Sequence, residues 1–175
     1  MIERVVYLMR GLPSCGKSHT ARCLAGDQGV VLETDQFFVR QQPDGTELFE
    51  YSEALVPEAR RWNFERFQQA IADGISPIIV DRGNGRNVET RNYVLYARHH
   101  GYHVELREPD SPWWGEIREL LRDKQANEES LRAWADRLAE KSRRNHRVPI
   151  ATILDWMFAW KWDLTVDDIA NHQPR

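Results

Sequence analysis

One stretch near the start of the sequence matches a phosphate-binding loop at every defined position. Residues 11–18 read Gly-Leu-Pro-Ser-Cys-Gly-Lys-Ser, which fits the pattern G-x-x-x-x-G-K-[ST]. Its two glycines permit the backbone angles and the close approach that let successive N–H groups surround phosphates. Lys17 brings a positive charge to the β- and γ-phosphates, and the Ser18 hydroxyl is placed to ligate Mg²⁺. The loop therefore predicts a site for ATP or GTP, formed by Gly11, Leu12, Pro13, Ser14, Cys15, Gly16, Lys17, Ser18 and the adjacent His19.

Two acidic residues end predicted strands, at the edge where parallel sheets bind ligands. The run Val-Val-Leu-Glu-Thr-Asp ends on Asp35, and the run Ile-Ile-Val-Asp ends on Asp81. Asp35 either accepts the proton of an attacking hydroxyl, joins the Mg²⁺ shell or caps a turn. Asp81 has the form of a Walker B acid, which orients Mg²⁺ through water or contacts the acceptor. Phe37 and Phe38 either stack on a substrate base or belong to the core.

Arginines gather in two further places. Residues 82–87 read Arg-Gly-Asn-Gly-Arg-Asn. Arg82, Asn84 and Arg86 would offer anion contacts there, or the segment is an ordinary turn that caps the next helix. Residues 141–147 form the densest positive stretch, after an apolar stripe at helical spacing.

That stretch lies within a predicted lid of about 112–147. Arginine from a mobile helix commonly stabilises a transferring phosphate, whereas a basic helix end also complements the helix dipole. Four Lys or Arg side chains exceed what the dipole needs, so we favour the phosphate role for Arg143 and Arg144.

An alternation of strands and helices is expected to position these residues. The strands are predicted at 4–10, 29–34, 76–81 and 102–107. The helices are predicted at 17–25, about 53–73, 87–100, a long section within 112–144, and 149–160. Alternation of this kind indicates an α/β fold with a parallel sheet covered on both faces. Residues 43–46, Pro-Asp-Gly-Thr, predict an exposed turn, and 122–130 a charged joint between two helices.

Length and composition indicate one globular domain over residues 1–175. The chain has 41% hydrophobic and 29% charged residues and a net charge of −3, so no overall basic field indicates a nucleic-acid binder. No apolar stretch approaches a membrane span, and no signal peptide is recognised, so no membrane association is expected. The two cysteines, Cys15 and Cys23, favour reduced thiols and a cytoplasmic location.

The chain resembles the P-loop kinases related to phage polynucleotide kinase, and the small P-loop ATPases similar to it. The matches follow one another in order from about residue 5 to 158. They are 11–18 with G-x-P-G-S-G-K-S, 34–38 with T-D-D-Y-F, 62–63 with W-N, 78–84 with I-I-V-D-N-T-N, 101–104 with G-Y-x-V, 108–109 with E-P, and 113 or 114 with a tryptophan. Arg143, His146, Val148, Pro149 and Ile150 resemble the R-N-x-H-G-V-P segment and its helix.

The resemblance implies a P-loop kinase fold with a helical lid and transfer of phosphate to a 5′-hydroxyl. It makes Asp35 the general base, lets Lys17 and Ser18 hold ATP·Mg²⁺, and makes Arg143 the clamp on the transferring phosphate. The phage enzyme has an arginine three residues after its base, where this chain has Phe38, and Arg40 is the candidate substitute.

We therefore expect an ATP-dependent kinase that acts on the 5′-OH of RNA or DNA, alone or beside a ligase or phosphatase. One alternative is a kinase of a small metabolite, nucleoside or nucleotide sugar. Another is a non-catalytic, ATP-dependent interaction module.

Overall fold

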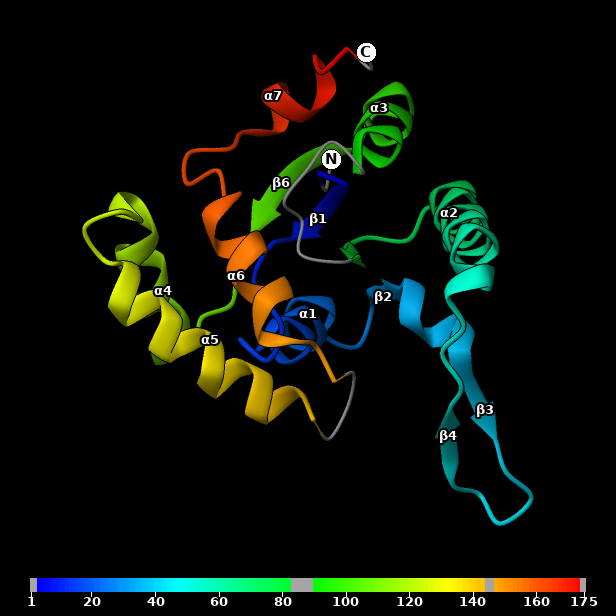
Figure 1. Cartoon of the computed structure of the whole chain (residues 1–175). Coiled ribbons are helices and arrows are strands. Elements are labelled where there is room, and N and C mark those ends of the chain that lie inside the picture. Colours follow the sequence, from blue (N-terminus) through cyan, green and yellow to red (C-terminus); the bar gives the residue numbers. More distant parts are fainter. Residues whose placement is uncertain (1–2, 83–89, 144–146, 174–175) are drawn as a thin grey trace.

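A four-stranded parallel sheet forms the centre of the computed structural model, which describes residues 3–82, 90–143 and 147–173 (Figure 1). Its strands lie in the spatial order β2 (Val30–Glu33), β5 (Ile78–Asp81), β1 (Val5–Met9) and β6 (His103–Arg107). These are the four strands that the sequence predicts. Because all four run in the same direction, their carboxyl ends meet at one edge, where the P-loop and both acids follow.

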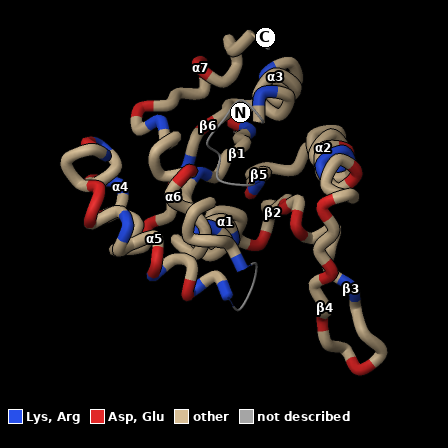
Figure 2. Tube along the Cα trace, in the orientation of Figure 1, with Lys and Arg blue, Asp and Glu red and all other residues tan. Residues whose placement is uncertain are grey.

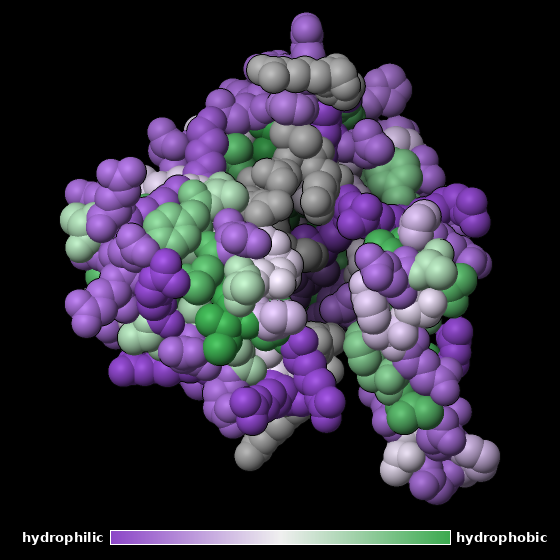
Figure 3. Space-filling model, viewed as in Figure 1, coloured by the Kyte–Doolittle hydropathy of each residue, from purple (hydrophilic) through white to green (hydrophobic). Residues whose placement is uncertain are grey.

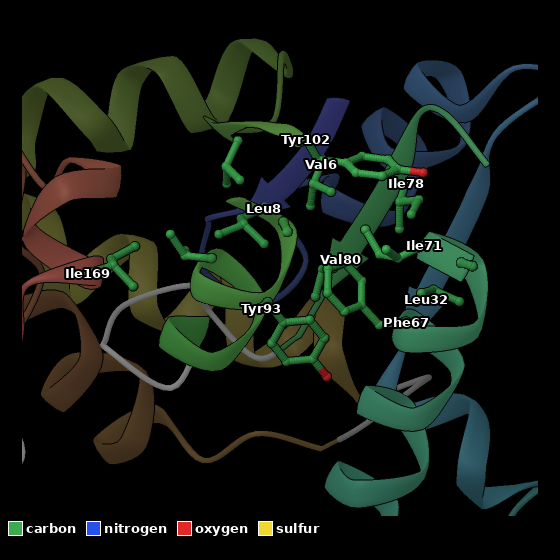
Figure 4. Close-up of a cluster of buried hydrophobic side chains, with 14 of the residues drawn as sticks. Val6, Leu8, Leu32, Phe67, Ile71, Ile78, Val80, Tyr93, Tyr102 and Ile169 are labelled. Atoms are coloured by element: carbon green, nitrogen blue, oxygen red, sulfur yellow. The ribbon is translucent and has the colours of Figure 1, made fainter. Parts of the chain in front are cut away.

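Helices cover both faces of the sheet, and the two central strands, β5 and β1, are apolar apart from the acid that ends β5. One face packs against α2 (Val56–Ala72), α3 (Arg91–His99) and α7 (Val166–Ala170). Figure 4 shows this cluster, with side chains of Val6, Leu8, Ile78 and Val80 from the sheet meeting those of the helices. The other face packs against α1 (Lys17–Ala25). The predicted arrangement, with helices on both faces, is confirmed.

A second cluster of buried side chains joins three helices to the P-loop. We call α4 (Pro112–Leu120), α5 (Glu128–Ser142) and α6 (Ile150–Phe158) the helical body. Ser111 caps α4 by accepting a hydrogen bond from the Trp114 backbone N–H (3.3 Å), and Pro112 occupies the first turn. The predicted stripe of Leu131, Trp134 and Leu138 lies inside this body as packing. The predicted long helical section is two helices, separated at the expected charged joint.

The arm, residues 39–49, was not predicted from the sequence. It consists of β3 (Val39–Gln41) and β4 (Glu47–Phe49), which pair antiparallel in a two-stranded sheet separate from the main one. Its tip is the predicted turn: the backbone N–H of Gln42 donates to the Thr46 carbonyl (2.8 Å). Figures 1 and 3 show the arm standing away from the helical body, with the surface hollowed between them.

The C-terminal α7 was also missed, although it buries Ile169 completely against the sheet face. The other predicted helices appear as α1, α2, α3 and α6, and α2 is preceded by a 3-10 turn over Glu53–Leu55. No helix in the described part of the chain is long and apolar enough to cross a membrane.

Candidate active site

The P-loop connects β1 to α1 and turns two of its side chains away from the nucleotide position. Leu12 and Cys15 are fully buried among residues of the helical body. Burial raises the pKa of the Cys15 thiol to about 12, so the thiol is protonated at neutral pH. The loop therefore presents its backbone to a ligand, while these side chains anchor it.

Three positions of the P-loop have close contacts or backbone angles that favour glycine, and two of them are glycines. A Cβ on Gly11 would lie 2.9 Å from the Pro109 Cδ and 3.1 Å from the Lys17 Cγ, so only glycine fits there. Gly16 has a φ of 91° at the N-cap of α1, and Ser14 also has a positive φ of 59°. Such left-handed turns before a helix N-terminus let backbone N–H groups form a concave anion site.

The segment after β6 holds this loop in place. The Ser111 hydroxyl donates to the Cys15 carbonyl (2.8 Å), and the Trp113 indole N–H donates to the Ser14 carbonyl (3.1 Å). One turn into α1, the Thr20 hydroxyl donates to the Asp110 carboxylate (3.0 Å). The sequence indicates only that this segment follows a strand at the ligand-binding edge, because these hydrogen bonds join residues 90 to 99 positions apart.

Ser18 and Asp81 meet beside the loop. The Ser18 hydroxyl donates to the Asp81 carboxylate (3.3 Å), and the Lys17 ammonium donates to the Leu12 carbonyl (3.1 Å). Burial raises the pKa of Asp81; the nearby charge of Lys17 and the Ser18 hydrogen bond lower it, and the Asp35 charge raises it. The described residues contain no group of three His, Cys, Asp or Glu side chains that would hold a metal alone. A hydroxyl and one carboxylate nevertheless fit Mg²⁺, which prefers oxygen ligands and keeps several waters.

Two more carboxylates lie at the end of β2. Glu33 pairs in register with Asp81 and is half-buried. Burial raises the pKa of Glu33, as do the charges of Asp81 and then Asp35, whereas Arg22 and Arg66 lower it. Asp35 is exposed and is the second residue of the 3-10 turn Thr34–Phe38, which leads into the arm. The structure thus brings Asp35 to the same edge as Lys17, Ser18 and Asp81.

Arg66 is a cation of this edge that sequence reasoning missed. Its guanidinium lies over the Trp62 ring, 4.2 Å from the centroid, and donates to the buried Asn63 side chain (3.4 Å). Its charge lowers the pKa of Glu33. The match of Trp62-Asn63 to the W-N pair of the kinase family could have indicated Arg66, because Arg66 lies about one helical turn after that pair on α2.

The other predicted acceptor contacts are more dispersed. Arg82 directly follows β5. Burial raises the pKa of Tyr93, and the charge of Arg82 lowers it. Arg40 lies on the arm, where it donates to the Phe37 carbonyl (3.2 Å) and stands 3.9 Å from the Glu50 carboxylate. Asn84 and Arg86 lie outside the described residues.

The stacking role considered for Phe38 is wrong, because its ring is buried against Phe37, Phe49 and Tyr51. Phe37 is half-buried and packs edge-on against Trp62 (5.6 Å between ring centroids).

The lid cations lie at the end of α5. The Arg143 guanidinium is exposed and forms an ion pair with Glu140 of the same helix (3.1 Å). Lys141 lies over the Trp113 ring, 4.3 Å from its centroid, and so borders the residue that holds Ser14. Arg144 lies outside the described residues. His19, exposed on α1, has its Nε2 3.7 Å from the Cys23 Sγ.

Comparisons with known proteins agree with this geometry. A family model described as an AAA domain matches residues 6–149. Human NEDD4-binding protein 2 is 38% identical over 120 residues, 67% of this chain and 6% of that protein. Human YLP motif-containing protein 1 is 29% identical over 127 residues, 61% of this chain and 6% of that protein. The chain therefore spans about 6% of the length of these relatives.

A solved structure of the Pnkp1/Rnl/Hen1 RNA repair complex matches with a TM-score of 0.52 at 16% identity. The match covers 90% of this chain and 44% of the other. This likeness concerns the fold, and it confirms the predicted P-loop kinase-like architecture.

Proposed function

The chain belongs to the AAA domain family and has the fold of a nucleotide-binding phosphotransferase. On that premise, we propose that it transfers the γ-phosphate of ATP to the 5′-hydroxyl of an RNA or DNA end. The observation that carries this proposal is Asp35, an exposed carboxylate at the edge of the sheet that holds the P-loop. A general base needs such a position, open to an acceptor and close to the transferred group.

At the donor end, the P-loop backbone and Lys17 would bind the β- and γ-phosphates. Ser18 and Asp81 are the residues that would hold Mg²⁺, which when bound neutralises charge on those phosphates. The Asp81 carboxyl group must lose its proton to serve as a metal ligand. Burial raises its pKa and so disfavours this loss of the proton, whereas the charge of Lys17 favours it.

At the acceptor end, Asp35 would take the proton of the hydroxyl as its oxygen forms a bond to the γ-phosphorus. The bond from that phosphorus to the bridging oxygen breaks, and ADP leaves. Arg143 and Arg144 would stabilise the charge on the transferred group. Arg82, with Arg40, Asn84 and Arg86, would contact the acceptor.

The likeness to an RNA repair complex supports a nucleic-acid end as the acceptor and action beside other repair proteins. The cytoplasmic location that we propose rests on the two free thiols, Cys15 and Cys23. A small-molecule acceptor remains the competing outcome, since the chain carries a net charge of −3. The two outcomes differ in salt dependence, because polynucleotide binding releases counterions and weakens steeply as salt rises.

The test is transfer of labelled γ-phosphate from ATP·Mg²⁺ to short 5′-OH RNA and DNA oligomers and to nucleosides, at several salt concentrations. We expect labelled 5′ ends. When the oligomer concentration is limiting, the yield of labelled ends should fall as the salt concentration rises. Labelled nucleosides without labelled oligomers would identify a small-molecule kinase. ATP binding with no transfer to any acceptor would contradict the proposed function.

A further inference from the structure

The Trp62-Asn63 pair of α2 has no part in the chemistry proposed above, although it lies beside the ligand-binding edge of the sheet. Asn63 is fully buried, and its side chain joins three elements. Its amide nitrogen donates to the Leu32 carbonyl of β2 (3.5 Å) and to the Tyr93 hydroxyl of α3 (3.2 Å), and its oxygen accepts from the Arg66 guanidinium (3.4 Å). Both ends of this buried amide are therefore hydrogen-bonded, close to the carboxyl end of β2.

Trp62 connects this network to the turn that carries Asp35. The Arg66 guanidinium lies over the Trp62 ring, and the Phe37 ring packs edge-on against it, 5.6 Å between centroids. Phe37 belongs to the 3-10 turn Thr34–Phe38, in which Asp35 is the second residue. Figure 2 shows the consequence for charge, with basic residues of α2 above the acidic residues that follow β2. One face of α2 thus supports both the strand before the turn and the turn itself.

The turn needs such support. It has five residues, and the hydrogen bonds of a 3-10 helix have poorer geometry than those of an α-helix. A capping box between Glu33 and Gln36 fixes its first residues. The Asp35 side chain is exposed, so packing around the carboxylate itself does not set its position. That position depends on the contacts of the residues on either side of it, at Leu32 and Phe37.

We propose that Trp62 and Asn63 are positioning residues for Asp35, holding its turn where the carboxylate can meet the accepting hydroxyl. This inference rests on the proposed function, in which Asp35 is the general base. Asn63 fixes the end of the strand from which the turn starts, and Trp62 fixes the turn through Phe37. A misplacement of about 1 Å can lower the rate of an enzyme about 100-fold, so loss of either contact should act on the chemical step.

The test measures transfer of phosphate from ATP to a 5′-OH DNA 12-mer by Asn63→Leu and Trp62→Leu. Asn63→Leu keeps the branching of the side chain and removes its hydrogen bonds, and Trp62→Leu removes the aromatic contact with Phe37. We expect kcat to fall about 10- to 100-fold in both variants, with the KM for the 12-mer and the affinity for ATP unchanged. Trp62 is half-buried, so its variants test the inference even where Asn63→Leu does not fold.

Two control variants separate positioning from a general loss of stability. Trp62→Phe keeps an aromatic ring against Phe37 and should retain most of the wild-type kcat. Ile71→Ala opens a cavity further along the same helix, where Ile71 is buried against the sheet, and should lower the Tm without lowering kcat. An equal fall of kcat in Ile71→Ala would overturn the inference, as would a wild-type kcat in both leucine variants.

Amide hydrogen exchange tests the placement of the turn without relying on catalysis. Exchange over residues 33–38 should become faster in Asn63→Leu and Trp62→Leu, while the P-loop exchanges as in the wild type. Unchanged exchange of the turn in both variants would overturn the inference. Wild-type protein that binds ATP but transfers no phosphate, with the turn loosened in the two variants, would contradict the proposed function alone.

Discussion

The two sides of the sheet edge, which we call the donor side and the acceptor side after their proposed roles, are built in opposite ways. On the donor side, the P-loop is packed into the helical body through Leu12 and Cys15 and fixed by hydrogen bonds from Ser111 and Trp113. On the acceptor side, Asp35 is exposed, and the arm beyond it forms a sheet of its own. Leu48 of the arm and Tyr51, two residues after it, are open to solvent. A phosphate chain is the same in every nucleotide, so its site can be rigid, whereas the acceptor side must suit one particular substrate.

The difference extends to charge. Between residues 39 and 58 the chain carries five acidic residues and one basic residue, Arg40. Apart from Arg40 at its base, the arm and the segment that follows it therefore offer no basic side chain to a phosphate, and the other cations of this edge are Arg66, Arg82 and those at the end of α5. Recognition of an anionic acceptor is consequently expected around the base of the arm and at the lid, rather than at its tip.

The largest contrast should appear in stability. Trp114 is 1% exposed and packs edge-on against Trp160 in the helical body, so Trp114→Ala should cost about 3–5 kcal/mol of unfolding free energy. Tyr51 lies just after the arm and is 59% exposed, so Tyr51→Ala should lower the unfolding free energy by about 1 kcal/mol or less. Urea denaturation measures both. Equal losses would show that the arm is as tightly packed as the donor side.

Two glycines provide the next comparison. Gly11→Ala forces a Cβ against Pro109 and Lys17, which should cost about 1–3 kcal/mol and weaken ATP binding roughly tenfold or more. Gly45→Ala at the tip of the arm meets no atom within 4 Å but has a φ of 83°, so it should cost about 1 kcal/mol. Calorimetry with ATP should find that Gly45→Ala binds as the wild type does; weakened binding would mean that the arm shapes the donor site.

Asp81 should show a trade-off between stability and binding. Because burial raises its pKa, the folded chain holds that proton more tightly than the unfolded chain, so this group's contribution to stability falls as pH rises above its ordinary value of 3.8. Asp81→Asn removes the buried charge and should raise the Tm at pH 7 by about 2–4 °C. It should also weaken Mg²⁺-dependent ATP binding about tenfold. A lower Tm at pH 7 in the variant would contradict the assignment.

The smallest effect concerns the two thiols. Cys15 is fully buried with a pKa of about 12, whereas Cys23 is exposed. A disulfide reagent should therefore modify one thiol quickly in the folded protein and the second only when the donor side opens. Tyr51→Ala should leave the slow rate unchanged. Two fast thiols would show that the donor side is not closed as described.

Local sequence patterns predicted the donor side well. Apolar runs and a motif with fixed spacing predict the four strands, the P-loop and the placement of Asp35 and Asp81 at the ends of strands. The arm was missed because three-residue strands carry no detectable alternation, and α7 because five residues make little more than one helical turn.

The sequence did not predict the features of the site that depend on tertiary contacts. The hydrogen bonds of Ser111 and Trp113 and the position of Arg66 beside Glu33 join segments distant in the chain, which no local pattern encodes. The left-handed backbone conformation of Arg147 could not be predicted for another reason: glycine is the residue that normally indicates a positive φ, and this position is an arginine.

The most direct test of the proposed division is the turnover of Asp35→Asn at saturating ATP·Mg²⁺ and 5′-OH oligomer, with its ATP affinity measured in parallel. If the donor side is complete without Asp35, the variant should bind ATP as the wild type does while its phosphoryl transfer falls about 100-fold or more. Lys17→Ala is the matched control and should lose ATP binding itself. Transfer by Asp35→Asn at the wild-type rate would contradict the assignment of Asp35 as the base that defines the acceptor side.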